Sequence, residues 1–490
     1  MKGFEVLIPT SIKKEHLLIG VTAIALGMLS SSAIVTGGLK FWFPVVLIVF
    51  WGWVRFATKY PAEAFLVVIF FAEECFDMFT FGARQRLLSD IGYALMLPLI
   101  VLNFNRVWSH LFRVRWNYGV YIILFFSVIL FSLFCGSYLI FGQPMAFGLV
   151  AARKYLLFCS YFFLVAVGAT REEGFRLLKY LAWLGALVSL LSIVDVALGG
   201  GVVFSHYYAV GQERAGQLRI HVGEFLTIVS AIYSLVKFQE TSKGSFSRIF
   251  YAICFFLCLY NSIFIGMTRA VYGGIFITGI VWFLINKSYG KVMVFLFSVA
   301  LLATVALTGV LDSVLSESFL SEIYKETVTE IDKNEGNVSI RKEGFQYFYS
   351  LWLDRAPITG VGVFSDTKFP NNPVTIASAL RGYNYIDING FTTILFFGVG
   401  GIVLLCCFLY KSLRDVVSII RSPDFDGKYN YQVILLVFVY NLVTPTLNNM
   451  IVERMVVYTG LFLFLLHLGA GSEIKEGTSK QELNELGAPT

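Results

Sequence analysis

Long apolar runs recur along most of the chain and are separated by short polar connections. A helix needs about 20 apolar residues to cross the roughly 30 Å hydrocarbon layer of a membrane. The runs are continuous and do not alternate between apolar and polar positions, which predicts helices and not the strands of a barrel. The expected spans centre on residues 17–35, 41–56, 62–79, 91–104, 118–140, 155–169, 177–198, 221–238, 249–265, 270–285, 292–310, 387–410, 431–447 and 456–468.

One stretch, residues 311–386, breaks this rhythm because it is polar and rich in charged side chains. Within it, residues 340–354 place aromatic side chains, including Trp352, at helical spacing, which predicts an amphipathic helix. Pro357 should end that helix, and the glycines in residues 360–362 should form a tight turn. We therefore expect an all-α polytopic integral membrane protein with about 12–14 transmembrane helices. It should carry one large periplasmic loop that contains short amphipathic helices.

The polar stretch divides the chain into four expected parts. Lysine and arginine are concentrated in alternate connections between the apolar runs, and such connections face the cytoplasm. This pattern puts the N- and C-termini in the cytoplasm. The expected parts are an N-terminal transmembrane bundle of about 11 spans at 1–310, the periplasmic loop at 311–386, about three C-terminal transmembrane helices at 387–469 and a cytoplasmic tail at 470–490.

The composition agrees with a membrane protein and excludes several kinds of partner. The chain is 57% hydrophobic and 14% charged, whereas a soluble domain is about 45–50% apolar and about 25% charged. The net charge is +6, but the basic residues form no dense patch, so we expect membrane lipids and no nucleic acid as partners. The seven cysteines lack metal-ligand spacing with histidines, and His221 and Glu224 have no third ligand. We predict no metal and no cofactor.

Five arginines stand out because they fall on the expected outer face, where positive charge is disfavoured. A cation near the membrane is costly unless it has a partner, a route to water or a ligand. Arginine also binds phosphate oxygens through two parallel hydrogen bonds, so several arginines at one depth would suit a diphosphate headgroup. The alternative is that each one snorkels to the interface or pairs with a nearby carboxylate. These residues are Arg153, Arg214, Arg219, Arg269 and Arg341.

Four segments, in this order, resemble the bacterial O-antigen ligase and polymerase superfamily over about residues 145–410. The first is the arginine–glycine stretch 214–221 (RAGQLRIH), and the second is Thr-Arg-Ala at 268–270. The third runs from 339 to 362 and joins an arginine, a tryptophan-bearing helix and a Pro-x-x-Gly-x-Gly turn. The fourth is the glycine-containing span from 387 to 401. There Asp387 and Ile388 replace the His-Asn pair of the family, which tilts the prediction from a ligase toward a polymerase.

This resemblance implies a metal-independent, inverting glycosyltransferase of the bacterial inner membrane. Its donor would be a glycan linked to undecaprenyl pyrophosphate, and it would polymerise oligosaccharide repeat units of an O-antigen or exopolysaccharide. In the ligases the histidine is the proposed base, and an aspartate can also accept a proton. The resemblance and the arginine argument together give the candidate catalytic residues Asp387, Arg269 and Arg341. The candidate pyrophosphate- or glycan-binding residues are Arg214, Arg219, Arg153, His221, Trp352 and Tyr383.

Three other functions remain open, and one of them is a structural or transport protein that borrowed the fold, since members of one fold can differ in function. An O-antigen ligase would share the donor and transfer the glycan to lipid A-core. A lipid-linked oligosaccharide flippase or another transporter would also need many spans, although such proteins commonly show two similar halves and short loops. His221 could instead cap a helix or make a local hydrogen bond. Many polymerases of the family act with a chain-length-regulating co-polymerase, which is a further possible partner.

Overall fold

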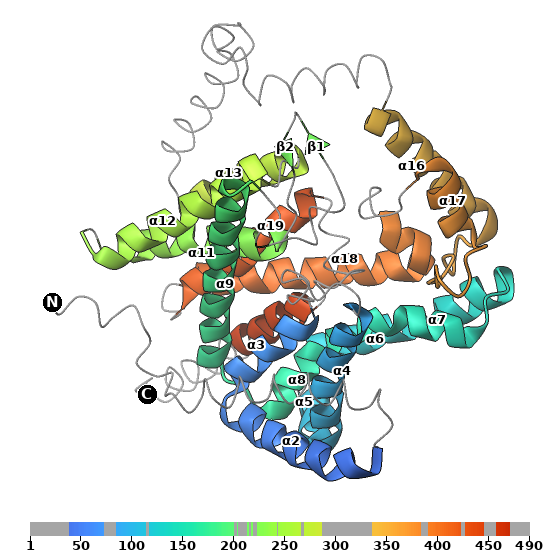
Figure 1. Cartoon of the computed structure of the whole chain (residues 1–490), viewed down its shortest axis with the longest axis horizontal. Helices are drawn as coiled ribbons and strands as arrows, with labels where there is room; N and C mark the ends of the chain where they lie inside the picture. Colours follow the sequence, from blue (N-terminus) through green and yellow to red (C-terminus); the bar gives the residue numbers. More distant parts are fainter. Residues whose placement is uncertain are drawn as a thin grey trace, which may run out of the picture.

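The computed structural model describes residues 39–72, 85–113, 117–199, 203, 213–214, 217–218, 223–242, 244–265, 269–286, 336–383, 391–422, 427–444 and 457–470. Most of these residues belong to helices (Figure 1). The strands among them are β1 (Glu213–Arg214) and β2 (Gln217–Leu218), which are two residues long each and pair with one another. The expected spans at 17–35 and 292–310 lie outside the described residues.

The first half of the chain forms a series of helices joined by short connections. They are α2 (Leu39–Lys59), α3 (Pro61–Ala72), α4 (Gln85–Leu102), α5 (Phe104–Arg113), α6 (Tyr118–Ser132), the π-helix η2 (Leu133–Ile140), α7 (Met145–Ala152), the 3-10 helix η3 (Arg153–Cys159), α8 (Ser160–Val167) and α9 (Arg171–Ala197). Thr170 and Glu173 form a capping box that starts α9, which satisfies donors that a helix N-terminus leaves unpaired.

The second half continues the helical pattern and contains the loop helices. Its elements are α11 (Glu224–Glu240), α12 (Phe246–Tyr260), the π-helix η4 (Asn261–Ile265), α13 (Arg269–Ile285), α16 (Gly336–Arg355), α17 (Pro373–Arg381), α18 (Phe391–Arg421) and α19 (Lys428–Val443). A C-terminal helix, Val457–Ala470, follows. The helix expected at 340–354 is thus confirmed as α16, which ends two residues before Pro357.

The helices include several that can cross a membrane. Among the described residues, five are long and apolar enough, or six if the pair Asp90–Leu102 and Phe104–Leu111, bent by 76°, is one span. Shorter apolar helices, Pro61–Phe71, Gly273–Ile285 and Val457–Ala470, accompany them. The protein is therefore an all-α polytopic membrane protein. The total of about 12–14 spans stays a prediction, because expected spans fall outside the described residues.

One candidate span differs clearly from its expected boundary. The sequence predicts a span that starts at residue 155, but the structure has a continuous apolar helical stretch, Met145–Val167. Arg153 consequently lies inside a candidate span and not in a loop. Its guanidinium is 3.0 Å from a carboxylate oxygen of Asp90 in α4. An ion partner of this kind is what allows a charge to remain at such a position.

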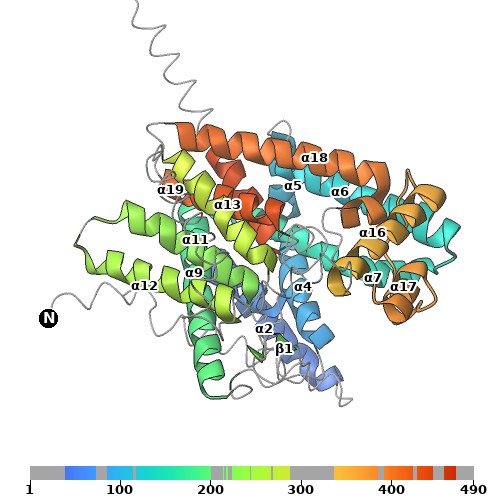
Figure 2. The same ribbon diagram turned by 90° about the horizontal axis from the view of Figure 1, so that it is seen from above.

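The arrangement of the helices places the loop at one end of α18. Figures 1 and 2 show α18 running alongside α6, while α16 and α17 lie beyond the end at which α18 begins. A single hydrophobic core runs through the bundle and extends to Phe348 of α16, which is fully buried. The loop helices are therefore packed against the membrane helices and do not form a separate unit.

Candidate functional site

The helix α18 is broken at Gly398, whose backbone is non-helical with φ 59° and ψ −153°. The carbonyl groups of the turn before such a break lose their partners within the helix, and in a membrane each must find another. Here the loop supplies them. The backbone N–H of Val361 donates to the carbonyl of Leu395 over 2.8 Å, and that of Gly362 donates to the carbonyl of Phe396 over 3.0 Å.

Three glycines allow the backbones to approach this closely. Gly360 has φ +69°, and a Cβ atom there would collide with the carbonyl of Phe396. A Cβ atom at Gly398 would collide with the carbonyl of Ile358, and one at Gly136 of η2 with the carbonyl of Gly360. We call this contact between the turn, η2 and the break in α18 the glycine junction. The Pro-x-x-Gly-x-Gly sequence is thus the segment that docks the loop onto the membrane helices.

Side chains from the α6–α7 region hold the chain just after the turn. The Gln143 side chain donates from Nε2 to the carbonyl of Val363 over 2.9 Å and accepts from the N–H of Ser365 over 2.8 Å. The Ser137 hydroxyl donates to the carbonyl of Val363 over 3.2 Å. Gln143 is 1% exposed, so these bonds are shielded from water. Nothing in the sequence around Gln143 indicated this role, because its partners lie more than two hundred residues away.

The aromatic residues of α16 pack around the first residue of α18. The ring of Phe391 lies 5.9 Å from that of Trp352, 5.1 Å from Phe345 and 6.0 Å from Tyr349, measured between ring centroids. The Trp352 indole N–H donates to the carbonyl of Pro357 over 3.1 Å, which fixes the end of the helix to the turn. Phe345 and Tyr349 remain 43% and 42% exposed. We call these four rings the aromatic face.

A second contact of α16 involves the residue that follows α17. The Tyr383 hydroxyl donates to Glu343 over 2.9 Å, and the Ser339 hydroxyl donates to the same carboxylate over 2.8 Å. These hydrogen bonds, that of Ser339 first, lower the pKa of Glu343 below its ordinary value. The bond to Glu343 in turn raises the pKa of Tyr383. The Arg381 guanidinium lies 5.9 Å from the centre of the Tyr383 ring, so charge and aromatic surface meet here.

These two contacts flank the segment that carries the predicted base. Tyr383 comes just before residues 384–390 and Phe391 just after them, and both pack against α16. Asp387 itself lies outside the described residues. Glu343, Arg381 and Phe391 were not among the predicted site residues. For Glu343 the local sequence held one indication, because Ser339 lies one helical turn earlier and can bond to it. The neighbouring sequence gave no indication for Arg381 or Phe391.

The predicted arginines fall into four groups. Arg341 is exposed on α16 and makes no hydrogen bond or ion pair with any residue that the structure describes. Arg153 is paired with Asp90. Arg269 is the first residue of α13 and Arg214 pairs with Gln217 across the β1–β2 ladder, but their side chains lie outside the described set. The remaining two predicted residues, Arg219 and His221, lie outside the described residues altogether.

The structure thus gathers three of the predicted site residues at α16. Arg341 and Trp352 belong to this helix, and Tyr383 contacts it through Glu343. Comparison with known proteins adds no further identification. No protein-family model matches the chain, and no curated protein matches it.

Proposed function

We propose that this protein is a membrane glycosyltransferase that polymerises undecaprenyl-pyrophosphate-linked oligosaccharide repeat units at the periplasmic face of a bacterial inner membrane. The observation that carries the proposal is α16. It presents an exposed arginine, a carboxylate and an aromatic face, and the glycine junction fixes it at the end of a broken candidate span. A substrate with a lipid anchor and a glycan needs such groups together at the membrane surface.

The aromatic face suits the glycan part of this substrate. Sugar rings present C–H faces beside hydroxyl groups, and tyrosine and tryptophan combine an apolar ring with a polar tip. Tyr349 is half exposed. Arg381 and Glu343 add a donor and an acceptor at the second contact of α16, around Tyr383. The alternative is that these rings only anchor the loop at the membrane interface.

The proposed reaction needs a base and positive charge. The hydroxyl oxygen of the acceptor sugar attacks the anomeric carbon of the donor, and the bond from that carbon to the pyrophosphate oxygen breaks with its electron pair. The configuration inverts, and the hydroxyl proton passes to the carboxylate of Asp387. Arg269 and Arg341 stabilise the charge that develops on the leaving pyrophosphate, while Arg214 and Arg219 bind it before the reaction. Arg153, which was also a candidate, is already paired with Asp90. Residues 384–390 lie between Tyr383 and Phe391, and both of these residues pack against α16. Such fixed ends suit a segment that must hold a base in position.

One observation favours a different function. Arg153 and Asp90 form an ion pair within candidate spans, and ionisable residues at such positions often mark transport pathways. A flippase or another transporter of lipid-linked oligosaccharide is therefore the second candidate. It differs from the enzyme in forming no covalent product.

The proposal is tested by replacing Arg341 and its neighbour Lys342, both exposed on α16. Membranes that contain the Arg341→Ala variant should convert lipid-linked repeat units about 100-fold more slowly, the loss typical for removal of one transition-state donor. The Lys342→Ala variant, which loses the same charge one residue away, should remain close to wild type. Equal rates for both variants would remove Arg341 from the mechanism.

A further inference from the structure

The short helix α5 follows α4 after a bend of 76° and packs against α8 (Figure 1). Val107 and Leu111 are buried on this side. The Nε2 atom of His110 is hydrogen-bonded to the hydroxyl of Tyr161 in α8 over 3.1 Å. One side of α5 therefore faces the bundle, while residues 104–106 and 108 are exposed.

The exposed part of α5 has two edges with opposite kinds of side chain. Phe104 and Trp108, one turn apart, are each 52% exposed, and their ring centroids are 5.5 Å apart. Arg106 is also exposed and lies two residues from each ring. Two residues correspond to about 200° around an α-helix, so the arginine projects from the edge opposite the aromatic pair. An apolar edge and a cationic edge on one helix are typical of a helix that lies along a membrane surface.

The surroundings of Arg106 indicate where this membrane surface lies. Gly168 ends α8 with φ 76°, and a Cβ atom there would collide with the Arg106 guanidinium. The candidate span Met145–Val167 ends one residue before Gly168, and the next candidate span, Arg171–Ala197, begins three residues after it. A connection this short between two spans has to lie where both leave the hydrocarbon. The cationic edge of α5 is therefore level with that boundary.

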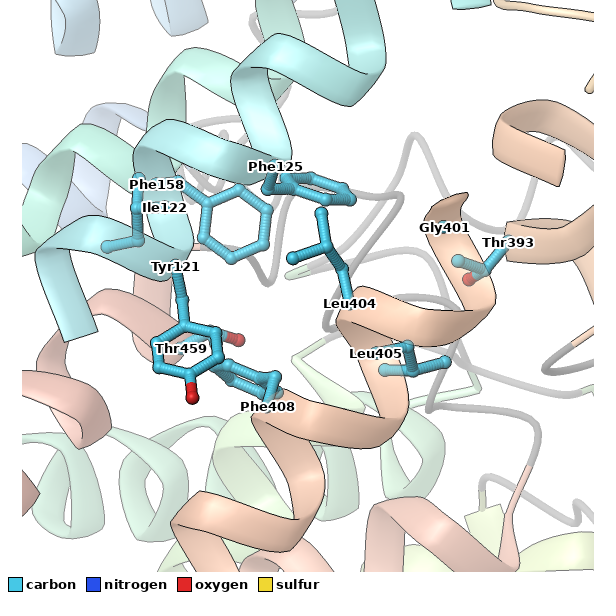
Figure 3. Close-up of a pocket in the computed structure, with 10 residues that line it drawn as sticks. All are labelled: Tyr121, Ile122, Phe125, Phe158, Thr393, Gly401, Leu404, Leu405, Phe408 and Thr459. Carbon is cyan, nitrogen blue, oxygen red and sulfur yellow. The ribbon is translucent and has the colours of Figure 1, made fainter. Parts of the chain in front are cut away.

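The far end of α5 is tied to the start of a third candidate span, Tyr118–Ile140. The Asn117 side chain caps this span by accepting from the N–H of Val120 over 3.1 Å. The same side chain donates to two carbonyl groups in the last turn of α5 over 2.8 and 3.1 Å. Tyr121 and Ile122, in the first turns of the span, line an apolar cavity against α18 (Figure 3). Both ends of α5 are thus fixed at ends of candidate spans.

Arg106 carries a charge that no carboxylate among the described residues neutralises in an ion pair. The sequence has no acidic residue between Asp90 and Glu172. The two carboxylates in the first turn of α9 are already engaged, one by Arg171 and the other by the backbone N–H of Thr170. A guanidinium binds phosphate oxygens through two parallel hydrogen bonds. Anionic phospholipids supply such oxygens at a membrane surface, above all in the cytoplasmic leaflet, which is the side expected for this connection.

We infer that α5 is a lipid-binding helix, whose rings Phe104 and Trp108 insert among the acyl chains while Arg106 binds the phosphate of an anionic phospholipid. The inference is independent of the proposed glycosyl transfer, because it uses only α5 and the span ends around it. The helix selects anionic over zwitterionic lipids. A phosphatidylcholine headgroup carries its own cation beside the phosphate, so it gains less from Arg106 than phosphatidylglycerol does.

Trp108 allows a local test, because bromine atoms on acyl chains quench only the indole rings close to them. Purified full-length protein is placed in phosphatidylcholine nanodiscs that contain an equal share of brominated phosphatidylglycerol or brominated phosphatidylcholine. The Trp108 emission is the difference between each protein and its Trp108→Phe variant. The inference predicts quenching by both lipids, with an about fivefold higher occupancy beside Trp108 for phosphatidylglycerol, as one arginine near an anionic surface gives. Absence of quenching, or equal occupancy of the two lipids, would overturn it.

Matched arginine substitutions separate Arg106 from positive charge in general. Arg106→Gln should abolish the preference for phosphatidylglycerol, and Arg106→Lys, which keeps the charge, should retain most of it. Arg355→Gln removes an exposed arginine at the end of the loop helix α16 and should leave the preference unchanged. Should Arg106→Gln not fold, as judged by gel filtration, high salt replaces it, because screening should reduce the preference in the unaltered protein. A preference that survives both treatments, or falls equally in Arg355→Gln, would contradict the inference.

Discussion

A Cβ atom added at Gly360 would lie 2.5 Å from the backbone nitrogen of Gly398, although these two glycines belong to different segments of the chain. One belongs to the turn of the large loop and the other to the break in α18. Their contact means that the loop and the candidate span share backbone hydrogen bonds. Any change that separates them should therefore affect the fold of both.

Substitution of Gly360 tests this contact against a glycine of similar conformation. Gly360 has φ +69° and Gly142 has φ +71°, but a Cβ atom at Gly142 would have nothing within 4 Å. Gly142→Ala should lower the free energy of unfolding by about 1 kcal/mol, because alanine disfavours the left-handed backbone conformation. Gly360→Ala should lower it by about 3 kcal/mol or more, because the new Cβ atom also collides with backbone atoms of α18. Thermal unfolding in detergent measures both, and equal losses would show that the junction is not tightly packed.

Replacement of Gln143 tests the bonds that hold the chain after the turn. In Gln143→Ala the carbonyl of Val363 loses the Gln143 donor, and the N–H of Ser365 loses its acceptor. The Val363 carbonyl keeps the Ser137 hydroxyl as a donor, so the main loss is the buried N–H of Ser365, and a buried group without its partner costs about 1–3 kcal/mol. The exposed Gln239, which bonds to Asn286, gives the control Gln239→Ala with an expected loss below about 0.5 kcal/mol. Similar unfolding temperatures for the two variants would argue against a structural role for Gln143.

The Glu343–Tyr383 hydrogen bond predicts a specific pH dependence. The pKa of Tyr383 is raised, so its stabilising contribution is complete below the ordinary tyrosine value of about 10 and is lost as the pH rises through the raised value. The pKa of Glu343 is lowered. Its contribution is therefore complete above about 4.3 and is lost as the pH falls through the lowered value.

The phenolate absorbance of Tyr383 gives a direct measurement of this pair. The difference between wild type and Tyr383→Phe should show a tyrosine that titrates above pH 10. In a Glu343→Gln background the same difference should shift to lower pH, because the carboxylate that opposes the phenolate charge is gone. A Tyr383 titration that is the same in both backgrounds would exclude the hydrogen bond.

Much of the fold could be predicted from local sequence patterns. The range Tyr118–Ile140 follows directly from an apolar run of membrane-spanning length. The loop helix could be predicted because its aromatic residues keep helical spacing. Its end before Pro357 was also correct, since proline cannot continue a helix. In each case the signal lies within a few residues of the feature that it predicts.

The features that the sequence could not predict depend on contacts between distant residues. The span boundary near Arg153 was misplaced because its partner, Asp90, is far away in the sequence. The break at Gly398 is possible only because Val361 and Gly362 bond to the carbonyl groups beside it. The aromatic face likewise needed Phe391, which joins α16 only through the tertiary fold. The proposed roles of Arg214, Arg269 and Asp387 stay predictions.

The most direct test of the central proposal is an assay with purified protein in detergent. It is supplied with undecaprenyl-pyrophosphate-linked repeat units, once alone and once with lipid A-core, and the products are resolved on a gel. The proposal predicts a ladder of longer lipid-linked glycans from the repeat units alone, and loss of that ladder in Arg269→Ala. Transfer only in the presence of lipid A-core would identify a ligase. No covalent product in either reaction, with authentic substrate and folded protein, would contradict the enzyme proposal and favour a transporter.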